Sequence, residues 1–224
     1  MVKRGLKRKL FFMWILATVI IIAMLFLPAG TFDYWQAWIF LAVLLIPALF
    51  VLFYFLKRDP GLLERRMKFK EKEVEQKLII KLSMLLFILG FLIPGLDYRF
   101  GWSHVPTALV ILSDIIVVLG YTLVFFVFKE NSYTSRVIEV DKKQKVITTG
   151  PYSVIRHPMY LGVILMYIFM PLALGSYYAL IFFLPVIILI VFRTLNEEKV
   201  LAKDLKGYKK YMKKVKYRII PYVW

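Results

Sequence analysis

The stretch PMYLGVILMYIFMPLALGSYYALIFFLPVIILIVF, residues 158–192, decides the fold because it runs for 35 residues without a charged side chain. As one α-helix it would be about 52 Å long. That length is too great for one crossing of a hydrocarbon core about 30 Å thick and slightly short for two. Near its middle, Leu174-Gly175-Ser176 forms a break. We therefore expect a helical hairpin, which brings Arg156-His157 and residues 193–198 to the same membrane boundary.

Four further apolar stretches precede this hairpin, at residues 10–32, 34–56, 78–96 and 105–128. Each has about the 20 residues that a membrane helix needs. The composition agrees, because 61% of the residues are hydrophobic and the mean hydropathy is +0.71, which excludes a soluble globular domain or a disordered tail. The sequence predicts an all-α, polytopic membrane helical bundle of about six hydrophobic helices with a cytoplasmic C-terminal helical tail.

The charges give this bundle an orientation. There are 31 Lys and Arg against 14 Asp and Glu, a formal net charge of +17. We expect no nucleic-acid partner, because the basic residues lie between long uncharged stretches rather than on one face. They lie before residue 10, at 57–77, at 129–157 and after 192, whereas the opposite loops hold only Arg99. The positive-inside rule places these basic segments and both termini in the cytoplasm.

Two short stretches have simpler interpretations. The apolar run at 10–27 is too long for the core of a signal peptide, so we expect it to stay as a membrane anchor. Residues 57–77 carry eight basic and five acidic residues and are expected to form a solvated helix or loop near anionic lipid. The protein is therefore expected to be a multi-pass integral membrane protein, in the inner membrane if the cell is prokaryotic.

The residue types limit the chemistry. The chain has no cysteine and two histidines, which excludes disulfides and a thiol nucleophile and argues against a metal site. Arg, Glu, Asp, His and Tyr remain. Asp114, near the middle of the fourth stretch, is costly to insert and is expected to have a polar partner or to face a functional cavity. A hydrogen-bonded packing role and a role in a substrate tunnel both stay open for it.

The second half of the chain holds the polar clusters. We divide the protein into a four-helix transmembrane region at 1–128 and a second region at 129–224, which carries the candidate functional residues. Residues 136–140 and 145–149 flank an Asp-Lys-Lys-Gln turn and predict a small β-hairpin. A helix is expected from Arg193 until Gly207 interrupts it. Along that helix Arg193 and Glu197 share a face, whereas Glu198 is turned away by about 100°, so the two acids can serve different partners.

Three motifs carry a resemblance to a known family. They are GPYSVIRHPMY at 150–160, RTLNEEKVL at 193–201, and GYKKY at 207–211 followed by Tyr217-Arg218 and Pro221. In this order and on this topology they resemble the isoprenylcysteine carboxyl methyltransferase and phospholipid methyltransferase superfamily, integral membrane enzymes that use S-adenosylmethionine. The stretches DYRFGW at 97–102, NSYTS at 131–135 and PLALGS at 171–176 also resemble prokaryotic members.

The resemblance implies a pocket for S-adenosylmethionine, with S-adenosylhomocysteine as its product. Its residues would be Gly150, Pro151, Tyr152, His157, Tyr160, Glu197 and Glu198, with Tyr208 and Tyr211 of the tail folding over it. A glutamate can bind the ammonium of the cofactor, His157 or backbone N–H groups can donate hydrogen bonds, and tyrosines can cover the adenine or the sulfonium.

The methyl acceptor is expected to be a lipid-like or prenylated small molecule that enters from the bilayer. A carboxylate acceptor needs a cationic anchor rather than a base, and Arg156 and Arg193 are the candidates. An amine headgroup must lose a proton, which His157 or a glutamate would receive. Carboxyl O-methylation is the first hypothesis, and phospholipid N-methylation and a non-enzymatic lipid-binding protein are the alternatives. A lipid reductase finds no support, because the chain lacks a G-x-G-x-x-G fingerprint.

Overall fold

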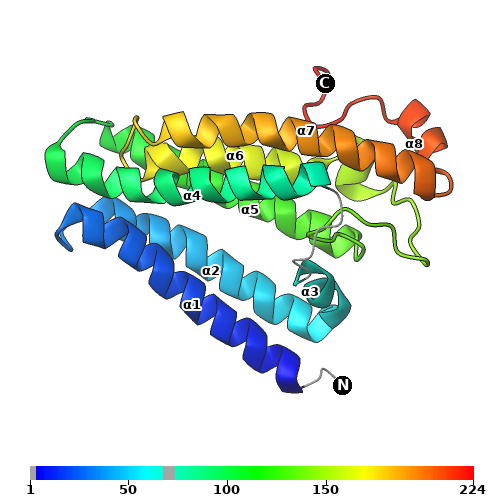
Figure 1. The fold of residues 1–224 in the computed structure, drawn as a ribbon, viewed down its shortest axis with the longest axis horizontal. Helices are drawn as coiled ribbons and strands as arrows, with labels where there is room; N and C mark the ends of the chain where they lie inside the picture. Colours follow the sequence, from blue (N-terminus) through cyan, green and yellow to red (C-terminus); the bar gives the residue numbers. More distant parts are fainter. Residues whose placement is uncertain (1–3, 68–73) are drawn as a thin grey trace.

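The computed structural model describes residues 4–67 and 74–224, and within these ranges the chain forms α-helices, one short 3₁₀ helix and no strand (Figure 1). The helices, in chain order, are α1 (Arg4–Ala29), α2 (Trp35–Arg58), α3 (Pro60–Arg66), α4 (Val74–Phe100), α5 (Thr107–Glu130), η1 (Gly150–Ser153), α6 (Pro158–Ala173), α7 (Leu180–Asp204) and α8 (Tyr208–Lys214). The expected all-α membrane bundle is confirmed.

Within the described ranges, five helices are long and apolar enough to cross a membrane: α1, α2, α4, α5 and α7. The protein is thus a multi-pass integral membrane protein. The sixth apolar helix, α6, has 16 residues and is therefore about 24 Å long. It is the shorter arm of the predicted hairpin, and α7 continues beyond it into the polar segment that holds Glu197 and Glu198.

The fold-back between α6 and α7 is confirmed. Gly175 has a left-handed φ of +73°, a conformation that a residue with a Cβ rarely adopts. The backbone N–H of Ser176 donates to the carbonyl of Pro171 at 2.9 Å, which closes the turn. The two helices then run side by side in opposite directions (Figure 1). Residues 174–176 therefore form the turn of the helical hairpin that the sequence predicts.

The bundle is closely packed around α5 and α6. These helices approach so tightly that a Cβ on Gly120 would lie 2.8 Å from the carbonyl oxygen of Gly162. A core of buried aromatic and aliphatic side chains joins α1, α2, α4, α6 and α7, with Phe40, Phe91 and Phe183 fully enclosed. The contact of small residues lets two backbones meet, as is typical of membrane helices.

One end of the bundle is closed by a buried carboxylate. Asp97, at the end of α4, is 1% exposed and accepts hydrogen bonds from the backbone N–H and the hydroxyl of Ser103, both at 2.6 Å. It also accepts one from the hydroxyl of Ser176 in the α6–α7 turn. Tyr34 donates to the carbonyl of Leu174 at 2.5 Å. These bonds tie α2, α4 and the hairpin turn together at this end.

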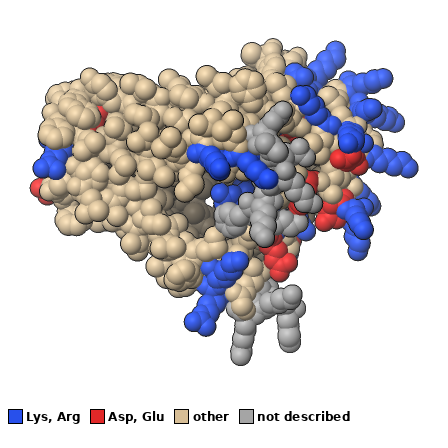
Figure 2. All heavy atoms as spheres, viewed as in Figure 1, with Lys and Arg blue, Asp and Glu red and all other residues tan. Residues whose placement is uncertain are grey.

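The charged side chains gather at the opposite end. Figure 2 shows Lys and Arg over the part of the molecule that holds α8, whereas most of the remaining visible face is uncharged. This distribution agrees with the asymmetry of the sequence.

Two expectations from the sequence change here. The β-hairpin at 136–149 is wrong, because residues 136–149 form an irregular segment without strands. Its turn does form, with the N–H of Gln144 donating to the carbonyl of Asp141 at 2.9 Å. Asp114 is buried in α5, but neither carboxyl oxygen has a hydrogen-bond partner among the described residues, so the expected polar partner is not found there.

Candidate active site

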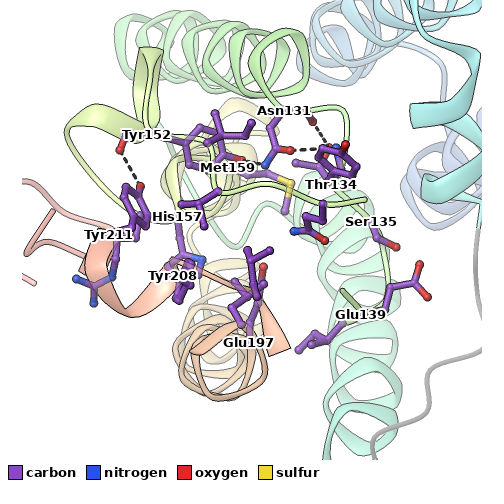
Figure 3. A pocket seen from close by; sticks show the side chains of 18 of the residues that line it. Asn131, Thr134, Ser135, Glu139, Tyr152, His157, Met159, Glu197, Tyr208 and Tyr211 are labelled. Carbon is purple, nitrogen blue, oxygen red and sulfur yellow. Dashed lines mark hydrogen bonds between the residues drawn. The ribbon is translucent and has the colours of Figure 1, made fainter. Parts of the chain in front are cut away.

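A cavity lies where the two ends of the hairpin meet the tail and the segment after α5 (Figure 3). Eight of the predicted site residues line it: Tyr152, Arg156, His157, Tyr160, Arg193, Glu197, Tyr208 and Tyr211. They come from η1, the start of α6, the far part of α7 and α8. The fold-back therefore brings together residues that are up to 59 positions apart in the chain, as the bond between Tyr211 and Tyr152 shows.

Glu198 lies behind the cavity wall and organises the side chains of two arginines and one histidine. Its Oε1 atom is 2.6 Å from the Nε of Arg156 and 3.3 Å from the Nε2 of His157, and its Oε2 atom is 2.9 Å from the Nε of Arg218. Glu198, Arg156 and His157 are each at most 6% exposed. Buried charges persist only when they are paired and hydrogen-bonded. The carboxylate of Glu198 is thus occupied by protein partners.

Arg156 also fixes the segment that follows α8. Its Nη1 atom donates to the carbonyls of Val215 and Lys216 at 2.7 and 2.8 Å. The backbone N–H groups of Arg156 and His157 donate to the carbonyls of Tyr217 and Arg218 at 3.0 and 2.8 Å. The tail is therefore held against the start of α6, and it closes the cavity on that side.

Glu197 belongs to the cavity itself. Its Oε2 atom accepts a hydrogen bond from the hydroxyl of Tyr160 at 2.5 Å, and the Nε of Arg193 donates to the same hydroxyl at 3.1 Å. The ring of Tyr160 stacks on that of His157 with centroids 5.7 Å apart. The prediction that the two adjacent glutamates serve different partners is confirmed.

The tyrosines of the tail form an aromatic wall. Tyr211 donates to the carbonyl of Tyr152 at 2.7 Å, and the rings of Tyr208 and Tyr211 lie 5.7 Å apart. Burial raises the pKa of both phenols, and the carboxylates of Glu198 and Glu197 raise that of Tyr208 further. Both side chains are therefore neutral at physiological pH. The hydroxyl of Tyr208 is buried and has no hydrogen-bond partner among the described residues.

Gly150 and Pro151 lie outside the cavity lining. Gly150 has a φ of +55°, and a Cβ there would lie 3.2 Å from the carboxyl carbon of Glu130. Pro151 stands in the first turn of η1, where its fixed φ and missing N–H are tolerated. The two residues set the direction of the chain into Tyr152, whose hydroxyl accepts from the Nδ2 of Asn131 at 3.0 Å.

The sequence reasoning missed part of the wall. Asn131, Tyr133, Thr134, Ser135 and Glu139 also line the cavity. In Figure 3, Thr134, Ser135 and Glu139 lie on the side opposite Tyr208 and Tyr211. The resemblance of residues 131–135 to family members was the available signal. No local pattern in an irregular segment indicates which side chains will face a cavity formed by distant helices.

A comparison with known families agrees with this geometry. Residues 108–207 match the family described as phospholipid methyltransferase. Over these residues the chain is similar to this family, which belongs to the isoprenylcysteine carboxyl methyltransferase and phospholipid methyltransferase superfamily. No curated protein sequence matches the chain significantly. The matched residues extend from α5 to Gly207 and include the ends of the α6–α7 hairpin that meet at the cavity. Together with the membrane helices, this match supports an integral membrane methyltransferase.

Proposed function

We propose that the protein transfers a methyl group from S-adenosylmethionine to a lipid-like acceptor at the cytoplasmic membrane face, by carboxyl O-methylation. The observation that carries the proposal is the open cavity in which Glu197, Arg193 and the tyrosines of three separate elements face one space. The excess of basic residues in segments on this side supports its cytoplasmic location. Residues 129–224 form the methyltransferase core in this proposal, and residues 1–128 form the membrane region.

The cavity residues suit the chemical groups of the cofactor. Bound S-adenosylmethionine supplies a methyl group activated by a sulfonium, together with an ammonium and a flat adenine. Glu197 offers a carboxylate on the cavity wall for the ammonium. The rings of Tyr208 and Tyr211 offer electron-rich surfaces, and the unpartnered hydroxyl of Tyr208 offers a hydrogen bond. The residues present therefore fit the group.

Glu198 has a different role from Glu197 in this proposal. Because its oxygens are taken by Arg156, His157 and Arg218, it acts as a positioning residue. It keeps the start of α6 and the tail at the distance that leaves the cavity open. Gly150 and Pro151 likewise act by placing Tyr152.

The acceptor meets a basic part of the same wall. Arg156 is ion-paired with Glu198, so we assign the acceptor carboxylate to Arg193, which lines the cavity. The Nε, Nη1 and Nη2 atoms of Arg193 donate to Tyr160, Gln76 and the carbonyl of Arg136 at 3.1, 3.0 and 2.6 Å, and these bonds hold its guanidinium at the wall. A carboxylate is already nucleophilic at neutral pH. The protein then has to align it with the methyl group and exclude water.

Phospholipid N-methylation is the second candidate, and the matched family favours it by its description. That reaction needs a group that receives a proton. His157 and Glu197 line the cavity and are the candidates for it.

Titration calorimetry of the protein in detergent with S-adenosylhomocysteine tests the proposal. The wild type should bind, and Glu197→Gln should lose affinity by about tenfold or more, because a hydrogen bond to a charged group contributes about 1.5–3 kcal/mol. Asp204→Asn is the matched control, since Asp204 is an exposed acid on the same helix. Equal affinity of wild type and Glu197→Gln would contradict the role of Glu197, and no binding by the wild type would contradict the proposal.

A labelled-methyl assay then separates the two reactions. N-acetyl-S-farnesylcysteine and phosphatidylethanolamine are offered in mixed micelles with labelled S-adenosylmethionine. Label that base releases as methanol identifies an ester and O-methylation. Label retained in a base-stable amine identifies N-methylation. Cofactor binding without transfer to any lipid would favour the lipid-binding alternative.

A further inference from the structure

The NSYTS segment, residues 131–135, is held in place from both sides. On one side Asn131 donates to the hydroxyl of Tyr152 at 3.0 Å. The segment also folds on itself, because the N–H of Tyr133 donates to the Oδ1 of Asn131 at 2.9 Å and the hydroxyl of Thr134 donates to the carbonyl of Asn131 at 3.1 Å. The other side meets α3, which lies in the connection between α2 and α4 and outside the matched family region.

The contact with α3 is made by two consecutive arginines. The Nε of Arg65 donates to the carbonyl of Ser132 at 2.7 Å, and the Nη1 of Arg66 donates to the carbonyl of Ser135 at 3.2 Å. Their guanidinium groups also lie over aromatic rings, with Arg65 5.7 Å from the centroid of Tyr133 and Arg66 5.1 Å from that of Phe128. Each arginine thus combines a backbone hydrogen bond with a cation–π contact.

The short helix that presents these arginines has a defined start. Asp59 accepts a hydrogen bond from the N–H of Leu62 at 3.0 Å, and Pro60 occupies the first turn. A capped start with proline is typical of a stable helix N-terminus. Leu62 is fully buried, which anchors the helix to the bundle. The arginines are therefore carried by an ordered element at the end of α2.

Arg66 also reaches the cavity wall. Its Nη1 atom is 3.8 Å from the sulfur of Met159, which lines the cavity next to Tyr160. Directly after the NSYTS segment, the carbonyl of Arg136 accepts a hydrogen bond from the Nη2 of Arg193 at 2.6 Å. Arginines of α3 and α7 thus hold the carbonyls of residues 132, 135 and 136. This wall stands opposite the tyrosines of the tail (Figure 3).

We infer that α3 is part of the acceptor site, with Arg66 as the positioning residue that sets residues 131–136 against the headgroup of the acceptor. The inference rests on the proposed function, because it assumes that the methyl donor lies at the tail side of the cavity. The wall held by α3 is next to Arg193, the proposed anchor of the acceptor. Since α3 follows directly on a membrane-spanning helix, this wall lies at the membrane boundary, where a lipid headgroup arrives.

The first test compares Arg66→Gln, Arg66→Lys and the control Arg58→Gln, which removes an exposed charge at the end of α2. Arg66→Gln should lower kcat/KM by about tenfold or more for whichever of the two lipid probes is methylated. The reason is that a displaced cavity wall would misalign the acceptor with the methyl donor. The affinity of Arg66→Gln for S-adenosylhomocysteine should stay within about twofold of the wild-type value. Arg66→Lys should recover part of the lost kcat/KM by restoring the cation–π contact. Arg58→Gln should match the wild type. An unchanged kcat/KM, or an equal loss of cofactor affinity, would overturn the inference.

A second measurement does not depend on activity. The chain has no cysteine, so Ser132→Cys creates one labelling site at an exposed position. A nitroxide there should become more mobile when Arg66→Gln is added and should keep its spectrum when Arg58→Gln is added. Identical spectra in all three proteins would overturn the positioning role of α3. Absence of cofactor binding in the wild type would instead contradict the proposed function. The nitroxide spectra would then still decide whether α3 holds residues 131–136 in place.

Discussion

The two ends of the bundle each contain a buried carboxylate that joins distant elements, but their partners differ. Asp97 accepts from one backbone N–H and two hydroxyls, all uncharged. Glu198 is bonded to two arginines and a histidine, beside a cavity. At the first end, neutral donors bond the end of α4 to Ser103 and to the α6–α7 turn. At the second end, the bonds of Glu198 join α7, the start of α6 and the tail beside the cavity. The difference agrees with the proposal that one end serves stability and the other binds the cofactor and the acceptor.

The largest effect is expected from Glu198→Gln. The substitution leaves Arg156 buried without its counter-charge, and breaking a buried ion pair costs about 3–5 kcal/mol. Thermal unfolding in detergent should show a large fall in the midpoint, and binding of S-adenosylhomocysteine should be lost. Asp204→Asn, an exposed acid on the same helix, should unfold like the wild type. A Glu198→Gln protein with wild-type stability would remove the contrast between the two ends.

An intermediate effect is expected from Asp97→Asn. The amide keeps one acceptor oxygen but places an NH₂ group near the donors of Ser103 or Ser176, which costs about 1–3 kcal/mol for the unsatisfied groups. The unfolding midpoint should fall by less than in Glu198→Gln. Below this midpoint the affinity for S-adenosylhomocysteine should equal that of the wild type, because the cavity lies at the other end. Weakened binding would show that the Asp97 end also shapes the site.

The smallest effect on stability is expected from Tyr208→Phe. The hydroxyl has no hydrogen-bond partner among the described residues, so its removal should leave the unfolding midpoint unchanged or slightly raised. The affinity for S-adenosylhomocysteine should fall by a few-fold, since a hydrogen bond contributes about 0.5–1.5 kcal/mol. Tyr211→Phe is the informative counterpart, because its hydroxyl donates to Tyr152 and its loss should lower stability. Unchanged binding by Tyr208→Phe would exclude its hydroxyl from ligand recognition.

Much of the site was predictable because its residues lie at the ends of one apolar hairpin. Arg156, His157, Tyr160, Arg193 and Glu197 meet once residues 158–192 fold back, and the structure places all five on one cavity. The contribution of α3 was not predictable. The basic run at 57–77 was interpreted as a surface near lipid, since hydrogen bonds from arginines to the carbonyls of a distant segment have no signature in sequence. The β-hairpin at 136–149 was wrong: the carbonyl of Arg136, at the start of the first expected strand, accepts a hydrogen bond from Arg193 of α7, and only the turn from Asp141 to Gln144 forms.

The sequence by itself determined the membrane spans, the charge asymmetry and the turn at Gly175, because these depend on hydrophobicity, charge and backbone freedom within short stretches of chain. Only the tertiary structure decided that Glu198 is enclosed by two arginines and a histidine while Glu197 faces the cavity, and that α3 supports the wall at residues 131–136. Those outcomes depend on which side chains from distant helices arrive at the same point. Such contacts are set by the packing of the whole bundle.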